Sequence, residues 1–360
     1  MTNRRDFLKN VAAAGGVMFA GCSILGNRMS AQQTSAVPPT RRQAMVGGRR
    51  VKTIDIHAHV IVPEAMVMAG RKIAPTDGNI ITGKMAEDRF AKMDAWGIDM
   101  QALSLQPFWY ELDRDRVEPI IKFQNEKLAE LVAKYPDRFV AFATTAMQFP
   151  DLAAQQLEDG MKKYNLRGTA INGHPSGGAE FADPKYDVFW RKAEELGAVI
   201  FSHPQAIPEM EKRFAGKGAL SNTIGNPLET TIFLSHLIYE GTLDKFPGLK
   251  LCCAHAGGYL PSYIARSDYA CFRAPQQCTA MKKKPSEYLR QLYFDSMVFT
   301  PEGLRHLVAE CGASQIMIGT DYPFPWSETT VDHVLTTPGL SDQDKRAILG
   351  ETAAKLLKIT

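Results

Sequence analysis

The sequence predicts an α/β protein, a (β/α)8 TIM-like barrel in a single domain that follows an export signal. Three observations predict this fold. Short runs rich in β-branched and aromatic residues alternate with runs of helical periodicity from Val51 to Thr360. Eight strand-like runs fit within this length, as a barrel requires. Histidines and an aspartate recur where these runs end, at the edge where barrel enzymes carry their active sites.

The competing architecture is a doubly wound open sheet with helices on both faces. That fold usually places a glycine-rich phosphate loop after an early strand. No such loop follows an early predicted strand here, and the barrel is therefore preferred.

The composition is that of a soluble globular enzyme, with 360 residues of which 45% are hydrophobic and 22% charged. Lys and Arg number 42 against 39 Asp and Glu, which leaves a formal net charge of +3. Part of that excess lies near the N-terminus, so the folded body has no basic footprint of the kind that binds nucleic acid.

The first residues read as an export signal. In MTNRRDFLKN the pair Arg4 and Arg5 is followed by an uncharged run that is too short to span a bilayer comfortably. This order resembles a bacterial twin-arginine signal over residues 1–31, which implies export to the periplasm. Two end points remain open: FAGC resembles a lipoprotein box that would anchor Cys22 to the membrane, and MSA resembles a cleavage site ending at Ala31. Residues 32–50 read as a linker, and residues 51–360 as the barrel.

Cysteine usage does not describe a disulfide scaffold or a zinc knuckle. Cys271 and Cys278 lie in a polar loop and could pair in an oxidising compartment, or remain free thiols. Both alternatives stay open.

The predicted strands follow one another with helical segments between them. They comprise residues 53–59, 101–106, 139–146, 167–172, 198–204, 249–256, 293–299 and 315–321. The segment 117–135 illustrates the helices, because its apolar residues recur on one face: Val117, Ile120, Ile121, Leu128, Leu131, Val132 and Tyr135.

Two histidines stand one residue apart in the first strand, TIDIHAHV. Alternate residues of a strand project to the same face, so His57 and His59 aim both rings at one point. A chance pair of packed histidines is the alternative, but His203 ends the fifth strand and Asp321 ends the eighth. An unpaired aspartate at the end of an apolar strand would be costly to desolvate. The pattern therefore predicts a shared metal site.

The chain carries a resemblance to a known family. The motifs HAH, SHP, HAGG and GTDYPFP, with KMDAWGIDMQALS and GNPLETTIFLSHLIYEGTLDKFPGLKLCCAH, are similar to the amidohydrolase superfamily. The most similar branch is that of 2-amino-3-carboxymuconate-6-semialdehyde decarboxylase. The resemblance extends from about Ile54 to Leu357.

The resemblance implies roles for the residues at strand ends. It implies that His57, His59, His203 and Asp321 bind a divalent metal, with zinc expected and manganese as the alternative, and that no organic cofactor is needed. Imidazole and carboxylate donors with an open coordination position suit a catalytic zinc site. His255, which ends the sixth strand, is implied to act as acid and base beside the metal, with Asp321 also in the catalytic machinery.

The implied reaction is decarboxylation of a small unsaturated or aromatic carboxylic acid. A hydrolase acting on a lactone or cyclic amide is the first alternative, and a non-catalytic ligand-binding lipoprotein is the second. A binuclear site is not expected, because the hydrolytic relatives place a bridging Lys or Glu near the end of the fourth strand and RGTAINGHPS has neither.

The substrate side departs from the family pattern. The branch implies a homodimer in which an arginine after the sixth strand reaches across, and Arg273 is the candidate. A second arginine is absent from TDGNIITG, so Arg71, Lys72 or Lys84 would have to replace it. The aromatic residue expected before NPLETT is also missing, since SNTIG stands there.

Several other polar residues are ambiguous. His174 follows the fourth strand and either contacts the substrate or caps a turn. Glu229 and Asp295 either orient metal ligands or have only structural roles, on a helix face and a strand face respectively. His236 is expected to be structural.

Overall fold

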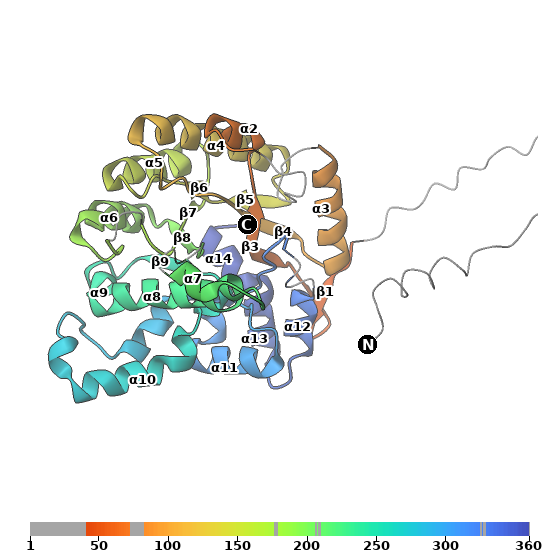
Figure 1. The fold of residues 1–360 in the computed structure, drawn as a ribbon. Coiled ribbons are helices and arrows are strands. Elements are labelled where there is room, and N and C mark those ends of the chain that lie inside the picture. Colours follow the sequence, from red (N-terminus) through yellow and green to blue (C-terminus); the bar gives the residue numbers. More distant parts are fainter. Residues whose placement is uncertain are drawn as a thin grey trace, which may run out of the picture. The chain divides into compact units, whose positions relative to one another are not determined.

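The computed structural model describes residues 41–72, 83–175, 179–205, 207, 210–324, 326 and 329–359, without the side chains of residues 83–87. Within this part the chain folds as an α/β protein of parallel strands flanked by helices (Figure 1). The proposed signal at residues 1–31 lies outside the described residues.

The parallel strands form two sheets. One has three strands in the order β3 (Ile54–Val60), β4 (Met100–Leu105) and β5 (Phe139–Ala141). The other has six strands in the order β11 (Ile316–Met317), β10 (Tyr293–Asp295), β9 (Lys250–Cys253), β8 (Val199–Ser202), β7 (Gly168–Ile171) and β6 (Ala143–Thr144). Within each sheet every strand pairs in parallel with its neighbour in the sequence, so the carboxyl ends of its strands share one edge.

Hydrogen bonds join the edges of the two sheets. The Phe142 amide, between β5 and β6, donates to the Leu103 carbonyl of β4 at 2.9 Å. At the other edge the Ile56 amide of β3 donates to the Ile318 carbonyl beyond β11, also at 2.9 Å. The first strand therefore lies beside the last.

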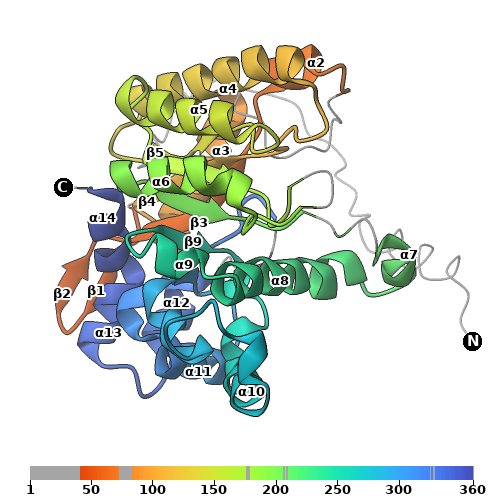
Figure 2. The same ribbon diagram turned by 90° about the vertical axis from the view of Figure 1, so that its left-hand side faces the viewer.

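Helices follow the strands and cover them from outside. The longer ones are α3 (Gly83–Trp96), α4 (Arg114–Lys134), α5 (Pro150–Lys162), α6 (Asp187–Leu196), α8 (Asn226–Tyr239), α10 (Leu260–Arg273) and α11 (Pro301–Cys311). The shorter ones are α2 (Pro63–Met68), α7 (Glu211–Phe214), α9 (Thr242–Lys245), α12 (Thr330–Thr336), α13 (Asp342–Arg346) and α14 (Thr352–Leu357). Figures 1 and 2 show α4, α5 and α6 on one side of the strands and α8, α10 and α11 on the other.

Single turns of tighter or wider helix fill several connections. They are η1 (Pro184–Tyr186), η3 (Ser221–Gly225), η4 (His255–Gly257), η5 (Pro275–Gln277), η6 (Pro285–Gln291), η7 (Ala313–Gln315) and η8 (Ala347–Glu351). Of these, η3 and η8 are π-helical. The wider turn η3 leads directly into α8, beside the site described below.

The core lies between the strands and the inner faces of these helices. All residues of β3 are buried, although the strand includes Asp55, His57 and His59. Helix α4 begins three residues earlier than predicted and ends one residue earlier, because sequence periodicity does not mark helix ends sharply. Its predicted apolar face is the buried one.

The segment predicted as a linker contains an ordered hairpin. Strands β1 (Ala44–Val46) and β2 (Arg49–Val51) pair antiparallel through a turn at Gly47 and Gly48. Both glycines have positive φ angles, +56° and +74°, which two-residue hairpin turns require. Val46 and Val51 are buried against the core. The linker prediction for residues 32–50 is therefore wrong for this part, since the hairpin packs with the folded body.

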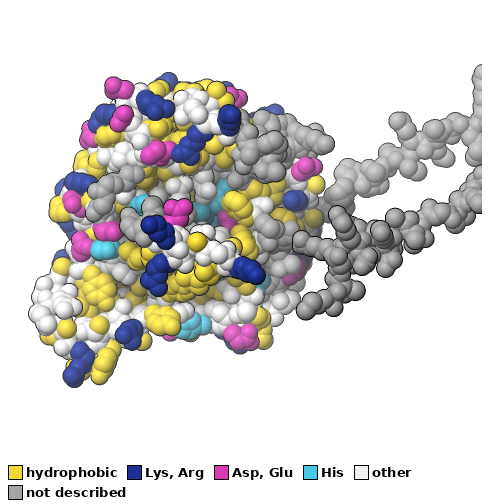
Figure 3. Space-filling model, in the orientation of Figure 1, with side chains coloured by type: hydrophobic (Ala, Val, Ile, Leu, Met, Phe, Trp, Pro, Cys, Tyr) yellow, Lys and Arg dark blue, Asp and Glu magenta, His cyan; other side chains and the backbone are white. Residues whose placement is uncertain are grey.

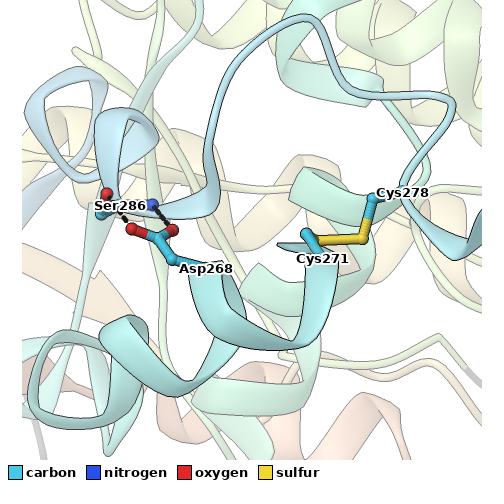
Figure 4. Close-up of a disulfide and its surroundings, with 4 residues drawn as sticks. All are labelled: Asp268, Cys271, Cys278 and Ser286. Carbon is cyan, nitrogen blue, oxygen red and sulfur yellow. Dashed lines mark hydrogen bonds between the residues drawn. A yellow bond between two sulfur atoms is a disulfide. The ribbon is translucent and has the colours of Figure 1, made fainter. Parts of the chain in front are cut away.

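Cys271 and Cys278 form a disulfide (Figure 4), which decides between the two alternatives left open by the sequence. The bond closes a short loop just after α10. Asp268, on the same helix, accepts hydrogen bonds from the amide and hydroxyl of Ser286 at 2.9 and 2.6 Å. Together these contacts fix the end of α10 to the segment that follows it. The remaining described cysteines are buried free thiols.

Across the part of the chain that the structure describes, no helix is both long and apolar enough to cross a bilayer.

Candidate metal centre

Four side chains from distant parts of the chain converge at the carboxyl ends of the strands. They are His57 and His59 on β3, His203 after β8 and Asp321 after β11. The donor atoms all lie within 4.8 Å of one another. The Asp321 Oδ1 atom lies 3.2 Å from His57 Nε2, 2.8 Å from His59 Nε2 and 4.0 Å from His203 Nε2.

Local backbone geometry makes this convergence feasible. The Asp321 amide donates to the His57 carbonyl at 2.8 Å, which places the two strand ends side by side. Asp321 has a positive φ of 59°, and this turns its side chain back over β3. A Cβ atom at Gly319 would lie only 2.8 Å from the Asp295 Cβ and 3.1 Å from the His57 Cβ. The packing therefore requires glycine at this position.

Each of the three imidazoles is held through its Nδ1 atom. The His57 Nδ1 donates to Asp295 Oδ2 at 2.6 Å, and the His59 Nδ1 lies 2.8 Å from Ser104 Oγ. The His203 Nδ1 lies 3.0 Å from the Gln106 Nε2, and turning the amide over presents the Gln106 oxygen to a proton on His203 Nδ1 instead. Fixing the Nδ1 proton in this way leaves each Nε2 lone pair directed at the shared centre.

The donor set fits a divalent cation. The His203 Nε2 is buried without a hydrogen-bond partner in the described structure, although buried polar atoms are normally satisfied. The His57 and His59 Nε2 atoms lie 3.0 Å apart, so a proton or a metal ion has to lie between them. Donors about 2.1 Å from one metal ion stand roughly 3 to 4 Å apart. The Asp321 Oδ1 atom lies 2.8 to 4.0 Å from the three Nε2 atoms, which is close to this spacing. Three imidazoles with one carboxylate suit zinc or manganese.

The electrostatics of the cluster agree with this fit. Burial lowers the pKa of His57, but the Asp321 and Asp295 carboxylates outweigh it and raise that pKa to about 10. Burial lowers the pKa of His59 to about 4, and burial with the neighbouring histidines lowers that of His203 well below its usual value. The Asp321 and Asp295 carboxylates therefore keep His57 protonated, and a metal ion can take the place of that positive charge.

His255 lies beside the four donors and faces a cavity. Its Nε2 atom is 3.7 Å from Asp321 Oδ2, and its ring centre is 5.3 Å from that of His57. His255 and Ala256 both have positive φ angles, 53° and 56°. The Asp295 carboxylate holds this strained turn, because it accepts from the His255 and Ala256 amides at 2.9 and 2.8 Å.

Asp295 thus joins the predicted metal ligands to the predicted acid. The sequence left Asp295 with two interpretations, and the structure supports the first, because its fully buried carboxylate also holds His57. Burial would raise the pKa of Asp295, but the hydrogen bond and charge of His57 lower it below the usual value. The carboxylate is therefore ionised at neutral pH.

A buried polar network lies beneath the cluster. Asp55 accepts from the His57 amide, from Gln101 Nε2 and from the Thr320 hydroxyl, at 3.0, 2.9 and 2.6 Å. Arg89 donates to Gln101 Oε1 at 2.9 Å and to the His59 carbonyl at 2.6 Å. Burial raises the pKa of Asp55 to about 6. This network ties β3 to β4 and to the segment that bears Asp321.

Sequence reasoning missed Ser104, Gln106, Asp55 and Gln101. A signal was present in QALSLQ, where polar residues interrupt an otherwise apolar strand and therefore needed buried partners. The partners themselves are not visible in the sequence, because strand register decides which polar residue meets which histidine.

The two substrate residues predicted from the sequence, Arg273 and His174, lie at the end of α10 and after β7. Arg273 ends α10 beside the disulfide, and neither it nor His174 is among the described residues that line the two cavities at the cluster. The His174 Nε2 lies 3.8 Å from Glu229 Oε1, and Glu229 accepts from the Gln205 amide at 3.0 Å. Burial raises the pKa of Glu229 to about 7.

Of the cationic substitutes proposed from the sequence, the structure describes the side chains of Arg71 and Lys72. Arg71 pairs with Glu111 and stacks on Trp109, with its guanidinium carbon 4.9 Å from the ring centre. Lys72 is exposed and lines neither cavity, and the Lys84 side chain lies outside the described structure. His236 is bound to Glu240 on its own helix, as expected for a structural residue.

Two cavities meet at the cluster. The larger, of about 450 Å³, is lined by His255, Asp321 and Asn222, with aromatic side chains around them. The smaller, of about 330 Å³, is lined by His203, Asp321 and Asn222. Two of the predicted ligands, His203 and Asp321, therefore line spaces of a size that small-molecule sites use, roughly 300 to 1,000 Å³.

Comparison with known proteins agrees with this geometry. The amidohydrolase family matches residues 54–359. The chain is 27% identical to a 2-amino-3-carboxymuconate-6-semialdehyde decarboxylase of Dictyostelium discoideum, over 84% of each chain. It is 30% identical to a gamma-resorcylate decarboxylase of Polaromonas sp., over 75% of this chain and 86% of the relative.

A solved structure is similar in three dimensions. It is a dihydroxybenzoic acid decarboxylase of Polaromonas sp. with bound manganese and the inhibitor 2-nitroresorcinol. The TM-score is 0.76 at 27% identity, covering 86% of this chain and 97% of the other. The match over nearly the whole folded body means that this chain is a member of the amidohydrolase family.

Proposed function

We propose that the protein is a divalent-metal-dependent decarboxylase of a small aromatic carboxylic acid. The observation that carries the proposal is the cluster of His57, His59, His203 and Asp321 with His255 facing the adjoining cavity. The decarboxylase activity of both relatives named above supports it.

His57, His59, His203 and Asp321 would hold the metal. When bound, a divalent ion supplies a Lewis acid that polarises an acid's oxygen atoms. Manganese in the similar solved structure supports Mn²⁺, and the imidazole-rich donor set keeps Zn²⁺ as the second candidate. No organic cofactor is proposed.

In the proposed reaction the bond between the ring carbon and the carboxylate carbon breaks. Its electron pair stays on the ring carbon, which takes one proton, and carbon dioxide leaves. His255 supplies that proton, because it lines the larger cavity and its backbone turn is held by Asp295. The Asp321 Oδ2 atom lies 3.7 Å from His255 Nε2, so the two side chains face the same reacting atoms.

A reaction screen tests the proposal. Metal-reconstituted protein is incubated with hydroxybenzoates, muconate-like acids and lactones, while carbon dioxide, released acid and bound metal are measured. We expect carbon dioxide from an aromatic acid, and a His255→Ala loss of at least a hundredfold, within the usual range for a general acid. The matched control is His306→Ala, on the exposed face of α11. Acid release from lactones alone would indicate the hydrolase, and ligand binding without turnover the non-catalytic alternative.

We also propose that the two sheets form one closed (β/α)8 barrel. The hydrogen bonds from Phe142 to Leu103 and from Ile56 to Ile318 support closure at both edges. The bridge between Ala58 and Tyr322 adds to the second edge. Exchange of the Ile56 amide hydrogen as slow as that of central-strand amides would agree with closure.

We further propose export by the twin-arginine pathway to the periplasm, with residues 1–31 as the signal. The disulfide between Cys271 and Cys278 supports an oxidising compartment. Mass spectrometry of the protein from a periplasmic fraction tests this. An N-terminus at Gln32 indicates cleavage after Ala31, and a lipid-modified Cys22 indicates a membrane anchor. An intact signal in the cytoplasm would contradict export.

Finally, we propose that the protein is a homodimer. Helix α10 exposes Tyr263, Tyr269 and Phe272, which are 65%, 64% and 74% exposed in the single chain. Figure 3 shows hydrophobic side chains at the lower left, where Figure 1 places α10. A patch of this kind suits a partner surface, and it lies next to Arg273. Light scattering of the wild type and of Phe272→Glu tests the assignment, with a monomeric variant expected.

A further inference from the structure

Four carboxamide side chains line the cavities beside the candidate metal centre, and one of them, Gln106, is already bound to His203. Asn222 lines both cavities, and Gln205 and Asn226 line the smaller one. Within the described structure none of these three side chains has a hydrogen-bond partner. A carboxamide both donates and accepts hydrogen bonds. The three residues, called the carboxamide wall below, can therefore bind uncharged polar atoms of a ligand.

Aromatic rings complete the lining. Tyr259, Phe299 and Trp326 line the larger cavity, and Phe324 lines the smaller one. Aromatic side chains bind flat apolar surfaces by stacking and edge contacts. A flat ring with uncharged polar substituents matches this combination of rings and amides.

The wall and the rings offer no cation to a second carboxylate. The charged or imidazole side chains that line the two cavities, among the described residues, are His203, His255 and Asp321. Arg71 is held by Glu111 and Trp109, and Arg89 lies below the cluster with its hydrogen bonds directed to Gln101 and His59. A carboxylate removed from water without a cation or charged donor carries a large desolvation penalty.

We infer that the carboxamide wall selects hydroxylated aromatic acids with one carboxylate over aromatic acids with two, and that Asn222 is a specificity-determining residue. The inference rests on the proposed function and adds charge selectivity to it. The single carboxylate goes to the metal, and the ring hydroxyls go to the wall. Asn222 is singled out because it alone of the three lines both cavities.

A matched pair of acids tests the inference. 2,3-Dihydroxybenzoate and 2-hydroxyisophthalate differ in whether ring position 3 carries a hydroxyl or a second carboxylate. Both are offered to metal-loaded protein, with kcat/KM measured from carbon dioxide release and Kd from calorimetry. We expect the singly charged acid to be preferred at least tenfold in Kd, and in kcat/KM wherever turnover occurs.

Asn222→Arg supplies the missing cation at the wall. We expect it to reduce the preference at least tenfold, because arginine binds a carboxylate with two parallel hydrogen bonds. Gln343→Arg adds the same charge at an exposed position on α13 and should leave the preference unchanged. Circular dichroism and thermal unfolding establish that both variants are folded.

The outcomes separate this inference from the proposed function. Carbon dioxide release with a preference for the dicarboxylate would overturn the inference and keep the decarboxylase. Tighter binding of the singly charged acid with no carbon dioxide from any acid would overturn the decarboxylase and keep the selectivity. A folded Asn222→Arg protein with an unchanged preference would overturn the role of Asn222. Strong dicarboxylate binding that is lost in Lys84→Ala would place the selecting group outside the wall.

Discussion

Asp295 offers the sharpest test of how the site is held together. Its carboxylate accepts from His57 Nδ1 and the His255 amide through Oδ2, and from the Ala256 and Met297 amides through Oδ1. Asn at this position keeps the shape but replaces one oxygen by an NH2 group. Whichever oxygen the NH2 group replaces, it points at two N–H donors and cannot accept their hydrogen bonds. The substitution therefore removes two accepted hydrogen bonds and the negative charge.

The expected loss divides between folding and metal binding. Hydrogen bonds to a charged group contribute about 1.5 to 3 kcal/mol each, so losing two destabilises the protein by at least about 3 kcal/mol. Without its acceptor the His57 ring is no longer held with Nε2 toward the cluster. Removing such a partner typically weakens metal binding by about 10- to 100-fold, or roughly 1.4 to 2.7 kcal/mol.

Competition with a chelator measures the metal affinity of Asp295→Asn, and urea unfolding of the metal-free protein measures its stability. The matched control is Asp268→Asn, because Asp268 also accepts two hydrogen bonds but lies beside the disulfide loop. The control should lose stability without losing metal affinity. A folded Asp295→Asn protein that binds metal within twofold of the wild type would refute the assignment of Asp295 to His57.

Three further predictions follow from the same contacts. Ser104→Ala removes the partner of the His59 Nδ1 and should weaken metal binding by about tenfold in the chelator assay, less than Asp295→Asn because the lost bond is uncharged. The metal must displace the proton that His57 holds with a pKa of about 10, so apparent affinity should rise as pH increases from 6 to 8; flat affinity in calorimetry would contradict this. Replacing Cys271 and Cys278 by serine should lower the free energy of unfolding by about 2 kcal/mol, and an unchanged melting temperature would count against an ordered native disulfide.

The positions of the four converging side chains were predictable because they depend on local rules. Alternation along β3 puts His57 and His59 on one face, and parallel strands bring their carboxyl ends to one edge. His203 and Asp321 needed only the correct recognition of two strand ends. The family resemblance, which the comparison supports, gave the same four residues. The order of the strands in the sheets is the one long-range feature on which this prediction depends.

Features that depend on loops and short strands could not be predicted from these rules. Whether His174 or Arg273 reaches the cavity depends on the paths of loops, which neither periodicity nor strand order determines. The sequence of residues 32–50 predicts a linker rather than a hairpin, because the two strands of the hairpin are only three residues each, too short for a pattern of alternation. The helix α4 differed only at its ends.

The buried network beneath the cluster explains why a site of converging donors is stable before a cation arrives. The histidine lone pairs and the Asp321 carboxylate repel one another or require hydrogen-bond partners. Each is held in place by a contact on the side away from the cluster. His57 is held by Asp295, His59 by Ser104, and the segment that bears Asp321 by Asp55 through Thr320. These restraints lie on β3, β4, β10 and the segment after β11, so the cluster is held by the sheets. The cavity walls come from η3, η4, α8, α10, α11 and the connections after β4, β8, β10 and β11. Substitutions in the walls can therefore change the substrate while the donor set is retained, and Asn222, in the turn η3, lies in the part that is free to vary.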